Sequence, residues 1–520
     1  MQSQTVINFL NSSVTYRENK GYSNGYIQNM YLDQNNTMRN FWGYEKLTNF
    51  PSPLCAFTID ITNNYYFAIT ENNEFVIYNT NYNPLLTINI NAFTLTNDIV
   101  QNILNPSFCD IIQTPDGNLV IINGGFCGLF LVKIPRDDNS NIILGQVDFL
   151  QYPYQPNVDY NPTTEQFSRL KFPKYLEYFD DKIFVTDGSL NLVYFASNLF
   201  TNTTTIWQSI AISSRPDKIQ KAVRIERVLC IVGENCVEMY YPTGDEFGFA
   251  KYNWLVESGT QFSNSITVIN GKLVFLGSNE NSSSEITIID LKEQRIKELN
   301  QNGLSIIFES LIKTDQAFGL NFSPSGQSFY ILHYSPEKTL LVNIDTNDYF
   351  FLTDENKKTA RMDKILRNLN QWIFLANNGQ IYEMSADIYS YDNNRIPMRI
   401  KPPLTQSDLS FTLKKLIVLT RPHTVNIQNI YQEGYITIYA NTDLTASTDG
   451  IQSNYDMQKC YSLLLNYKRT RYYDENVPSN IYNVCQMYAD VSQIVANTTD
   501  NEKIFFPVIF SKFDVEVEFT

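Results

Sequence analysis

The stretch SITVINGKLVFLGSNENSSSEITIID, residues 265–290, contains the pattern that decides the fold. Two apolar runs at 265–269 and 272–277 flank Asn270-Gly271, and a third run follows at 285–290. Asn-Gly supplies the positive φ angles that a two-residue hairpin turn requires. Runs of this length, rich in β-branched residues, are typical of strands. The stretch therefore predicts three strands, with the first two joined by a tight turn.

The same sequence of strand, polar turn and strand recurs outward from this stretch in both directions. Copies can be followed at 64–90, 110–134, 174–197, 221–241, 316–352 and 363–384. Units of about 40–50 residues with three or four strands have the spacing of propeller blades, which bury their faces on one another. We therefore predict an all-β fold, a β-propeller of about seven blades. A long sandwich or a pair of sandwiches is the second choice, because it would need no fixed unit.

Composition agrees with this fold class. Phe and Tyr each occur 34 times, and charged residues make up only 18% of the chain. Aromatic residues favour half-buried pleated surfaces. The 39 Lys and Arg against 54 Asp and Glu give a net charge of −15, whereas a protein that grips nucleic acid clusters its basic residues. We expect no tight nucleic-acid binding, although DNA could slide past such a surface, and like charge also favours solubility.

The repeated strand–turn–strand pattern is no longer seen after about residue 396. We therefore divide the chain into a propeller, 1–395, and a smaller β-rich domain, 396–520. RIKPPLTQ at 399–406 reads as a linker because its two prolines oppose helix and ladder bonding. Strands are predicted at 411–420, 435–441 and 513–519. A helix is predicted after Pro478-Ser479, from apolar residues in helical spacing: Ile481, Val484, Cys485, Tyr488, Val491 and Val495. The segment 151–168 reads as an insertion that carries contacts.

Residues that could carry chemistry are few. Seven cysteines lie far apart without a CxxC pair, and there are only two histidines, so we expect no metal site, no cofactor and no disulfide framework. Cys230 and Cys236 are predicted to be small core residues rather than a bridge. His333 is predicted to be a hydrogen-bonded core or blade-edge histidine.

Known catalytic patterns are also absent from the sequence. It has no GxSxG elbow, no Gly-rich phosphate loop and no HExxH, and SPSGQSF at 323–329 lacks the Asp and Trp of sialidase boxes. The chain is therefore predicted not to be an enzyme. No basic apolar leader is seen, and the most apolar segment, 119–134, is too short to span a bilayer. We expect a protein made in a cytoplasm, without a membrane partner.

Two basic stretches stand out from the acidic background. One contains Lys357, Lys358, Arg361, Lys364 and Arg367, and the other contains Lys468, Arg469 and Arg471. Solvated loops or faces are one interpretation of such runs. A docking patch for an acidic neighbouring subunit is the other.

The run from 215 to 277 resembles the central block of the packaged-DNA-stabilisation, or tail hub, proteins of short-tailed bacteriophages. That family has Pro-Asp before an apolar strand, a strand that ends in Gly-Glu, an aromatic residue with Thr-Gly, a pair of Phe residues, a Gly, and a Ser that opens the next blade. The matching residues here are Pro216, Asp217, Gly233, Glu234, Tyr241, Thr243, Gly244, Phe247, Phe249, Gly259 and Ser265.

The N-terminal block GYIQNMYLDQ is similar to the first strand of the same family, with Asn29 and Tyr31 matching. Near Pro51 the family has Pro-Gly, whereas this chain has Ser52. LKKLIVLT followed by Gly434 is similar to the closing region. The motif residues read as blade structure rather than as a binding site.

The resemblance implies a structural virion protein: a tail hub at the distal end of the portal–adaptor channel. Such a hub is assembled in the host cytoplasm, as a six-fold ring of copies below the adaptor. It would retain packaged DNA, let DNA pass without specific binding, and dock a tail needle or spikes. Two alternatives stay open. One is a carbohydrate- or receptor-binding propeller at the tail tip, and the other is a glycan-cleaving propeller with a central cluster of carboxylates.

Overall fold

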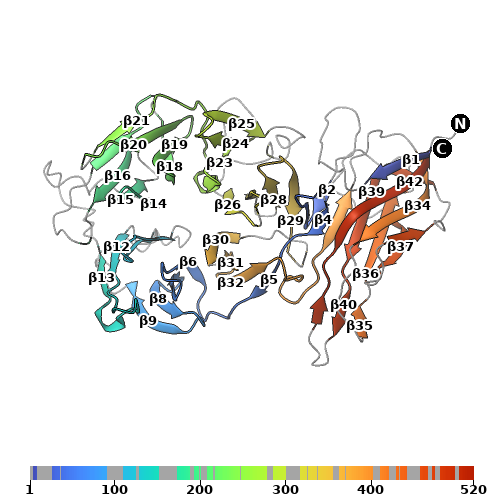
Figure 1. Cartoon of the computed structure of the whole chain (residues 1–520), viewed down its shortest axis with the longest axis horizontal. Helices are drawn as coiled ribbons and strands as arrows, with labels where there is room; N and C mark the ends of the chain where they lie inside the picture. Colours follow the sequence, from blue (N-terminus) through green and yellow to red (C-terminus); the bar gives the residue numbers. More distant parts are fainter. Residues whose placement is uncertain are drawn as a thin grey trace, which may run out of the picture.

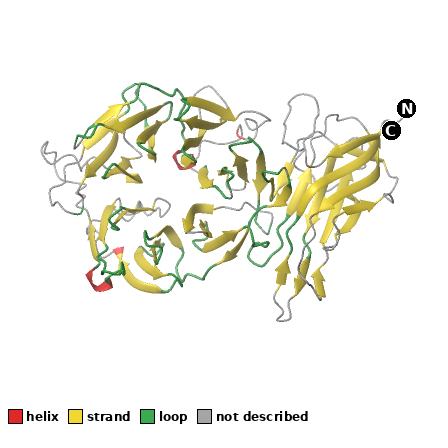
Figure 2. Ribbon diagram, viewed as in Figure 1, coloured by secondary structure: helices red, strands yellow, loops and turns green. Residues whose placement is uncertain are grey.

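The structure, a computed structural model, describes residues 4–8, 26–35, 37–90, 109–123, 128–151, 173–187, 192–197, 200, 208–214, 217–245, 248–277, 285–299, 308, 317–324, 326–335, 338–354, 356, 362–368, 371–401, 410–420, 429–432, 434–441, 457–465, 471–474, 481–497 and 503–519. Within these ranges almost every element is a strand (Figure 2). The exceptions that form named elements are two short 3-10 turns, η5 (Leu144–Gln146) and η6 (Ser263–Ser265).

Residues 43–385 form seven units of four antiparallel strands. Six of these units are separate sheets, and the unit at 318–352 is one end of a larger sheet. Six of the seven units are built from four strands that follow one another in sequence. The first three are β6 (Leu54–Ile59), β7 (Tyr65–Thr70), β8 (Glu74–Asn79) and β9 (Pro84–Asn89); β10 (Cys109–Gln113), β11 (Leu119–Asn123), β12 (Gly128–Lys133) and β13 (Asp148–Gln151); and β14 (Pro173–Phe179), β15 (Lys182–Asp187), β16 (Leu192–Ser197) and β17 (Gln208–Ala211). The next three are β18 (Ile219–Ile225), β19 (Val228–Gly233), β20 (Val237–Pro242) and β21 (Phe249–Lys251); β22 (Thr267–Ile269), β23 (Lys272–Gly277), β24 (Glu285–Asp290) and β25 (Arg295–Leu299); and β26 (Phe318–Phe322), β27 (Phe329–Ser335), β28 (Lys338–Asn343) and β29 (Tyr349–Leu352). The last unit joins β30 (Met362–Asn368), β31 (Gln371–Ala376) and β32 (Ile381–Ser385) to β5 (Gly43–Lys46).

These units form a closed ring (Figure 1). Their innermost strands touch in the order β6, β10, β14, β18, β22, β26, β30, and β30 then touches β6. Because β5 comes from the N-terminal side of the ring and pairs with β32, the first and last blades are joined by hydrogen bonds rather than by the chain alone. The predicted β-propeller is therefore confirmed.

The Asn270-Gly271 turn lies where the sequence predicts it, and Asp180-Asp181 forms a turn of the same kind. Asp180 and Asp181 have φ of 50° and 56°, and Asn270 and Gly271 have φ of 48° and 75°. Both positions of these turns lie in the left-handed region that a type I′ hairpin requires and that Asn, Asp and Gly tolerate.

Blade cores are built by the alternation of strand side chains. In β7, Phe67 and Ile69 pack toward the blade β10–β13, while Tyr66 and Ala68 pack toward β30–β32. Every adjacent pair of blades shares one such apolar cluster, so each blade buries both faces. Cys230 and Cys236 lie in these cores, fully buried and not bridged, as predicted.

The described residues outside the ring form short and long strands, mostly antiparallel, at one side of it. They are β1 (Gln4–Asn8), β2 (Tyr26–Gln28), β3 (Met30–Leu32), β4 (Met38–Asn40), β33 (Met398–Lys401), β34 (Ser410–Thr420), β35 (Asn429–Gln432), β36 (Gly434–Asn441), β37 (Met457–Leu465), β38 (Arg471–Asp474), β39 (Ile481–Ser492), β40 (Val495–Asn497), β41 (Lys503–Phe505) and β42 (Ile509–Phe519). The long strands β34, β36, β39 and β42 pair with one another in a single sheet, and β35, β40 and β41 form a small one.

The predicted helix after Pro478 is wrong, because residues 481–492 form β39. This strand pairs with β33, β34 and β36, whose residues lie about fifty to ninety positions earlier in the sequence. Ala489 and Val491 are buried while Tyr488, Asp490 and Ser492 between them are partly exposed, which is the two-residue period of a strand. Tyr and Val favour strands, and pairing on both sides outweighs the apparent helical spacing.

Two further sequence interpretations are corrected by the strand pairing. Residues 399–401 of the supposed linker belong to β33, which pairs with β2 and β39. The N-terminal strands β1 and β4, which we had included in the propeller, pair with β42 at the opposite end of the chain. Of the predicted insertion at 151–168, only Gln151 falls within the described residues.

Candidate functional site

The first candidate site is the set of residues that carries the tail-hub resemblance. Asp217 precedes β18 and its side chain lies under the turn between β19 and β20. Its carboxylate accepts the backbone N–H groups of Glu234 (3.1 Å), Asn235 (2.8 Å) and Cys236 (3.0 Å). The residue is only 4% exposed, so these three bonds compensate the burial of a charge. Asp217 therefore acts as an internal cap for the turn.

Two motif glycines leave room for this cap. A Cβ on Gly233 would collide with the Asp217 carboxylate, and a Cβ on Gly259 would collide with the backbone at Glu234 and Asn235. Thr260 N–H donates to Gly233 O at 3.0 Å, which holds the chain after β21 against the same turn. Both glycines are thus needed for close approach of backbone rather than for ligand binding.

Ser265 continues this network into the next two blades. Its Oγ donates to Phe262 O (2.7 Å) and accepts Leu276 N–H (3.1 Å), while its carbonyl oxygen accepts Tyr330 O–H (2.7 Å). Tyr330 belongs to β27, so this single residue fastens the blade β22–β25 to the blade β26–β29.

The remaining motif residues have local roles. Glu234 accepts Gln220 Nε2 at 3.2 Å, Gly244 occupies a turn with φ of 88°, and Phe249 packs on three Phe rings of the preceding blade. Pro216 and Phe247 lie outside the described residues. The described part of the motif is therefore a set of blade and blade-junction contacts.

Asn29 and Tyr31 lie where the propeller meets the C-terminal strands. Asn29 Nδ2 donates to Thr353 Oγ1 and to Pro397 O, each at 2.7 Å, and its Oδ1 accepts Thr353 N–H at 2.8 Å. Its φ of 54° lies in the left-handed region, which asparagine tolerates better than most residues. One buried amide thus links residues just after β29 to residues just before β33.

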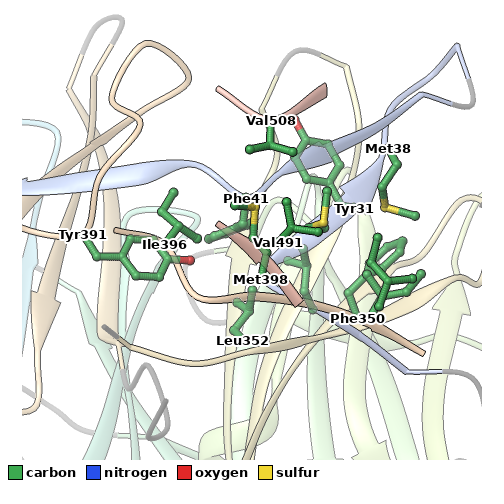
Figure 3. Close-up of a cluster of buried hydrophobic side chains, with 14 of the residues drawn as sticks. Tyr31, Met38, Phe41, Phe350, Leu352, Tyr391, Ile396, Met398, Val491 and Val508 are labelled. Atoms are coloured by element: carbon green, nitrogen blue, oxygen red, sulfur yellow. The ribbon is translucent and has the colours of Figure 1, made fainter. Parts of the chain in front are cut away.

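The apolar core also runs through this junction (Figure 3). Tyr31 packs edge-on against Phe329 at 5.6 Å, within a cluster that also holds Phe350 of the propeller and Val491 and Val508 of the C-terminal strands. Burial raises the pKa of the Tyr31 hydroxyl, which accepts Trp42 Nε1–H at 3.3 Å. Since β2 also pairs with both β29 and β33, sheet and core are continuous between the two parts.

Most of the predicted docking residues lie outside the part of the chain that the structure describes. Lys357, Lys358, Arg361, Lys468 and Arg469 lie outside the described residues, and Arg471 is placed only by its backbone in β38. Two other members of the first basic stretch are described. Arg367 stacks over Trp372 at 5.7 Å, and Lys364 Nζ lies 3.9 Å from Asp110 Oδ1.

The second candidate site is a polar cluster at the centre of the ring, which the sequence did not reveal. Asp110 in β10 and Lys364 in β30 approach each other although the blade β6–β9 separates them in the ring. Tyr175 in β14 reaches Ser263 in η6, with 2.7 Å between the two oxygens, past the blade β18–β21. Residues from non-adjacent blades can meet only around the ring axis, so these contacts place the cluster there.

Part of this cluster caps the open edges of the innermost strands. Asp110 accepts Leu176 N–H at 3.3 Å, and Glu177 accepts Arg224 N–H at 3.2 Å, each reaching the next blade. Lys221 Nζ donates to Ile266 O at 3.3 Å, again one blade on. Unpaired strand edges invite unwanted pairing, and side-chain caps satisfy them. Burial raises the pKa of Glu177 and lowers that of Lys221.

His333, the described histidine, has the role we predicted. It is 2% exposed, its Nδ1 lies 2.7 Å from Thr339 Oγ1, and its Nε2 accepts Met362 N–H at 3.0 Å. Across the described ranges, no group of three or more His, Cys, Asp and Glu side chains is arranged to hold a metal ion. No helix in the same ranges is long and apolar enough to cross a membrane.

Comparison with known proteins leaves the family open. No family model and no curated protein matches the chain. Among solved structures it is similar to the WD40 domain of Neurospora crassa Pan2, at 9% identity and a TM-score of 0.39, over 65% of this chain and 91% of that one. It is also similar to catalytically inactive virginiamycin B lyase from Staphylococcus aureus with quinupristin, at 10% identity and a TM-score of 0.43, over 66% and 98%. The propeller assignment therefore rests on the strand pairing of this chain itself.

Proposed function

We propose that this chain is a non-enzymatic structural protein of a virus particle: a tail hub at the distal end of the portal–adaptor channel. In this role, copies form a ring that retains packaged DNA and docks a tail needle or spikes. The proposal comes from the resemblance of residues 215–277 and 25–34 to tail hub proteins.

The observation that best supports it is the position of the resembling residues in the fold. Asp217 and Gly233 shape a turn within the blade β18–β21, and Gly259 packs the following segment against that turn. Ser265 fastens two blades together, and Asn29 holds the propeller to the C-terminal strands. A shared pattern made of framework residues suits a protein whose task is to keep its shape under load. The continuous sheet and core between the two parts supply that stiffness. The net charge of −15 would let DNA pass without being held.

The decisive test is quantitative mass spectrometry of purified, DNA-filled particles of the virus that encodes the protein. We expect a fixed copy number relative to the portal, and particles that lose their DNA when the gene is deleted. Restoring the gene in trans is the control and should restore DNA retention. Absence of the protein from purified particles would overturn the hub proposal.

A receptor- or carbohydrate-binding propeller is the second candidate, and one exposed feature favours it. Tyr241 and Tyr252 on the blade β18–β21 are 41% and 40% exposed, with ring centroids 5.5 Å apart. Exposed tyrosines offer both a stacking face and a hydroxyl to a sugar. Glycan-array binding by the purified protein, lost in the Tyr241→Ala/Tyr252→Ala double variant, would support this candidate. Equal binding by both proteins would remove it.

A further inference from the structure

The polar cluster at the ring centre has more hydrogen-bond donors than its neighbours use. Lys221 makes one hydrogen bond within the described residues, to Ile266 O at 3.3 Å, although an ammonium carries three donors. Lys364 Nζ is 3.9 Å from Asp110 Oδ1, a distance that allows attraction but is too long for a hydrogen bond. The Lys364 and Asp110 side chains are 31% and 28% exposed, so solvent reaches this place.

The carboxylates of the cluster, by contrast, already accept hydrogen bonds from the backbone. Glu177 accepts the backbone N–H groups of Tyr178 and Arg224, each at 3.2 Å, and Asp110 accepts those of Ile111 (2.9 Å) and Leu176 (3.3 Å). Each carboxylate thus uses two of its roughly four acceptor sites on the backbone, whereas Lys221 uses one of its three donors. A cation would compete with backbone groups for these oxygens, whereas an anion would meet unused ammonium donors.

The charges of the cluster favour the same kind of ligand. Lys221 interacts electrostatically with Lys364, Asp110 and Glu177. Lys174 adds a third ammonium group beside Tyr175. Lys174 and Lys221 lie over one Tyr175 ring, with their ammonium nitrogens 5.4 Å and 4.9 Å from its centroid. Burial raises the pKa of Glu177, so acidification removes one of the two negative charges. These five groups carry one net positive charge when all are ionised. Burial lowers the pKa of Lys221, and an anion bound beside it would favour the protonated form again.

We propose that the ring centre is a binding site for a small dianionic oxyanion of the sulfate and phosphate class, held by Lys221 and Lys364. Ammonium groups form their stronger hydrogen bonds with such oxyanions because donor and acceptor are both charged. The ligand supplies further acceptors to these two ammonium groups and joins β18 to β30 across the axis. This site does not depend on the tail hub proposal, since it uses contacts within one propeller.

Sulfate is the most informative probe because its charge is constant between pH 6 and pH 8. We expect isothermal titration of the full-length protein with sodium sulfate to show one saturable site. Lys221→Met and Lys364→Met should each weaken binding roughly tenfold or more, as expected for the loss of a charged hydrogen bond. Lys292→Met is the matched control: its side chain is 73% exposed and pairs with Glu226, so sulfate should bind as in the wild type. Sulfate should bind more tightly as the pH is lowered, because protonation of Glu177 removes a negative charge and Lys221 keeps its proton.

Several results would overturn this site. Folded wild-type protein without saturable sulfate binding would do so, as would unchanged affinity in Lys364→Met. Lys364→Met keeps the test valid if Lys221→Met does not fold. Its folding should be unaffected, because the Lys364 side chain is partly exposed and makes no hydrogen bond within the described residues. A short oligothymidylate is the second probe. Its displacement of sulfate would identify the bound group as a DNA phosphodiester and contradict a small-anion site.

Discussion

Strands pair mainly antiparallel both in the propeller and among the C-terminal strands. The two regions differ in how far apart in the sequence the paired strands lie. Within a blade, each strand pairs with the next one in sequence, as β22, β23 and β24 do. Among the C-terminal strands, β34 pairs with β42 and β39 pairs with β33, so partners lie about one hundred residues apart. When neighbouring strands pair, the turn between them has recognisable residues in the sequence. When distant strands pair, no such turn connects them.

This difference explains where sequence reasoning succeeded. Asn270-Gly271 predicts a hairpin, and the strands on either side of it lie within two residues of their predicted bounds. The outermost strand β5 was missed because its partner β32 lies more than three hundred residues away. The prediction of a helix at 481–495 was wrong for the same reason. The strand β39 forms because it pairs with distant strands, which cannot be inferred from residues 481–495 alone.

The largest expected effect comes from breaking a blade junction at Gly259. Gly259→Ala places a methyl group against the backbone at Glu234 and Asn235, which cannot move aside as a side chain can. We expect a loss of about 3 kcal/mol or more in the free energy of unfolding, measured by denaturant titration. Gly145→Ala is the control, because nothing lies within 4 Å of its added Cβ. Equal stability of the two variants would show that the junction tolerates repacking.

Acid should weaken the propeller through Glu238. Burial acts to raise the pKa of this carboxyl, but hydrogen bonds from Lys251 (2.6 Å), Ser214 N–H (2.7 Å) and Tyr240 O–H (2.6 Å) prevail and hold it at about 2. A depressed pKa stabilises the fold above the unfolded value near 4.5, and that stability is lost as the pH falls toward 2. The loss is about 3 kcal/mol for a shift of this size.

Urea unfolding between pH 5 and pH 2.5 measures this effect. Glu238→Gln removes the titrating group and should flatten the acid dependence while lowering stability at pH 7. If both proteins lost stability in parallel over this range, the acid sensitivity would have to come from other carboxylates.

The connection between the two parts can be loosened at Asn29. Asn29→Gly keeps the positive φ but removes the amide bonds to Thr353 and Pro397, whereas Asn29→Ala also adds backbone strain. We expect losses of about 2 and about 3 kcal/mol, respectively. Hydrogen exchange should rise first in β2, β29 and β33. Faster exchange spread evenly over all blades would contradict a local role.

The smallest effect concerns thiol reactivity. Burial raises the pKa of Cys230 to about 12, and its side chain is fully buried, so little reactive thiolate forms at pH 8. Cys55 is partly exposed. Alkylation of the native protein, followed by peptide mass spectrometry, should label Cys55 well before Cys230. Comparable labelling of both would mean that the blade β18–β21 opens readily.

The two candidate sites also differ in how far apart in the sequence their residues lie. Asp217, Gly233 and Gly259 lie in one continuous stretch, so a family-like pattern could point to them from sequence. The central cluster draws Asp110, Glu177, Lys221 and Lys364 from four blades, and no spacing in the sequence connects them. Lys364 appeared only as one member of a basic run, because its approach to Asp110 depends on closure of the ring.

That closure has a consequence for how the protein is made. β5 is synthesised early, but its partner β32 is complete only when residue 385 has been added. β1 waits still longer, since it pairs with β42 at the far end of the chain. At ribosomal rates of about 5–20 residues per second, a nascent chain therefore carries an unpartnered strand for tens of seconds. Any fragment that stops short of the last blade presents an open ring with a free edge, and quality control by chaperones and proteases can distinguish it from the finished molecule.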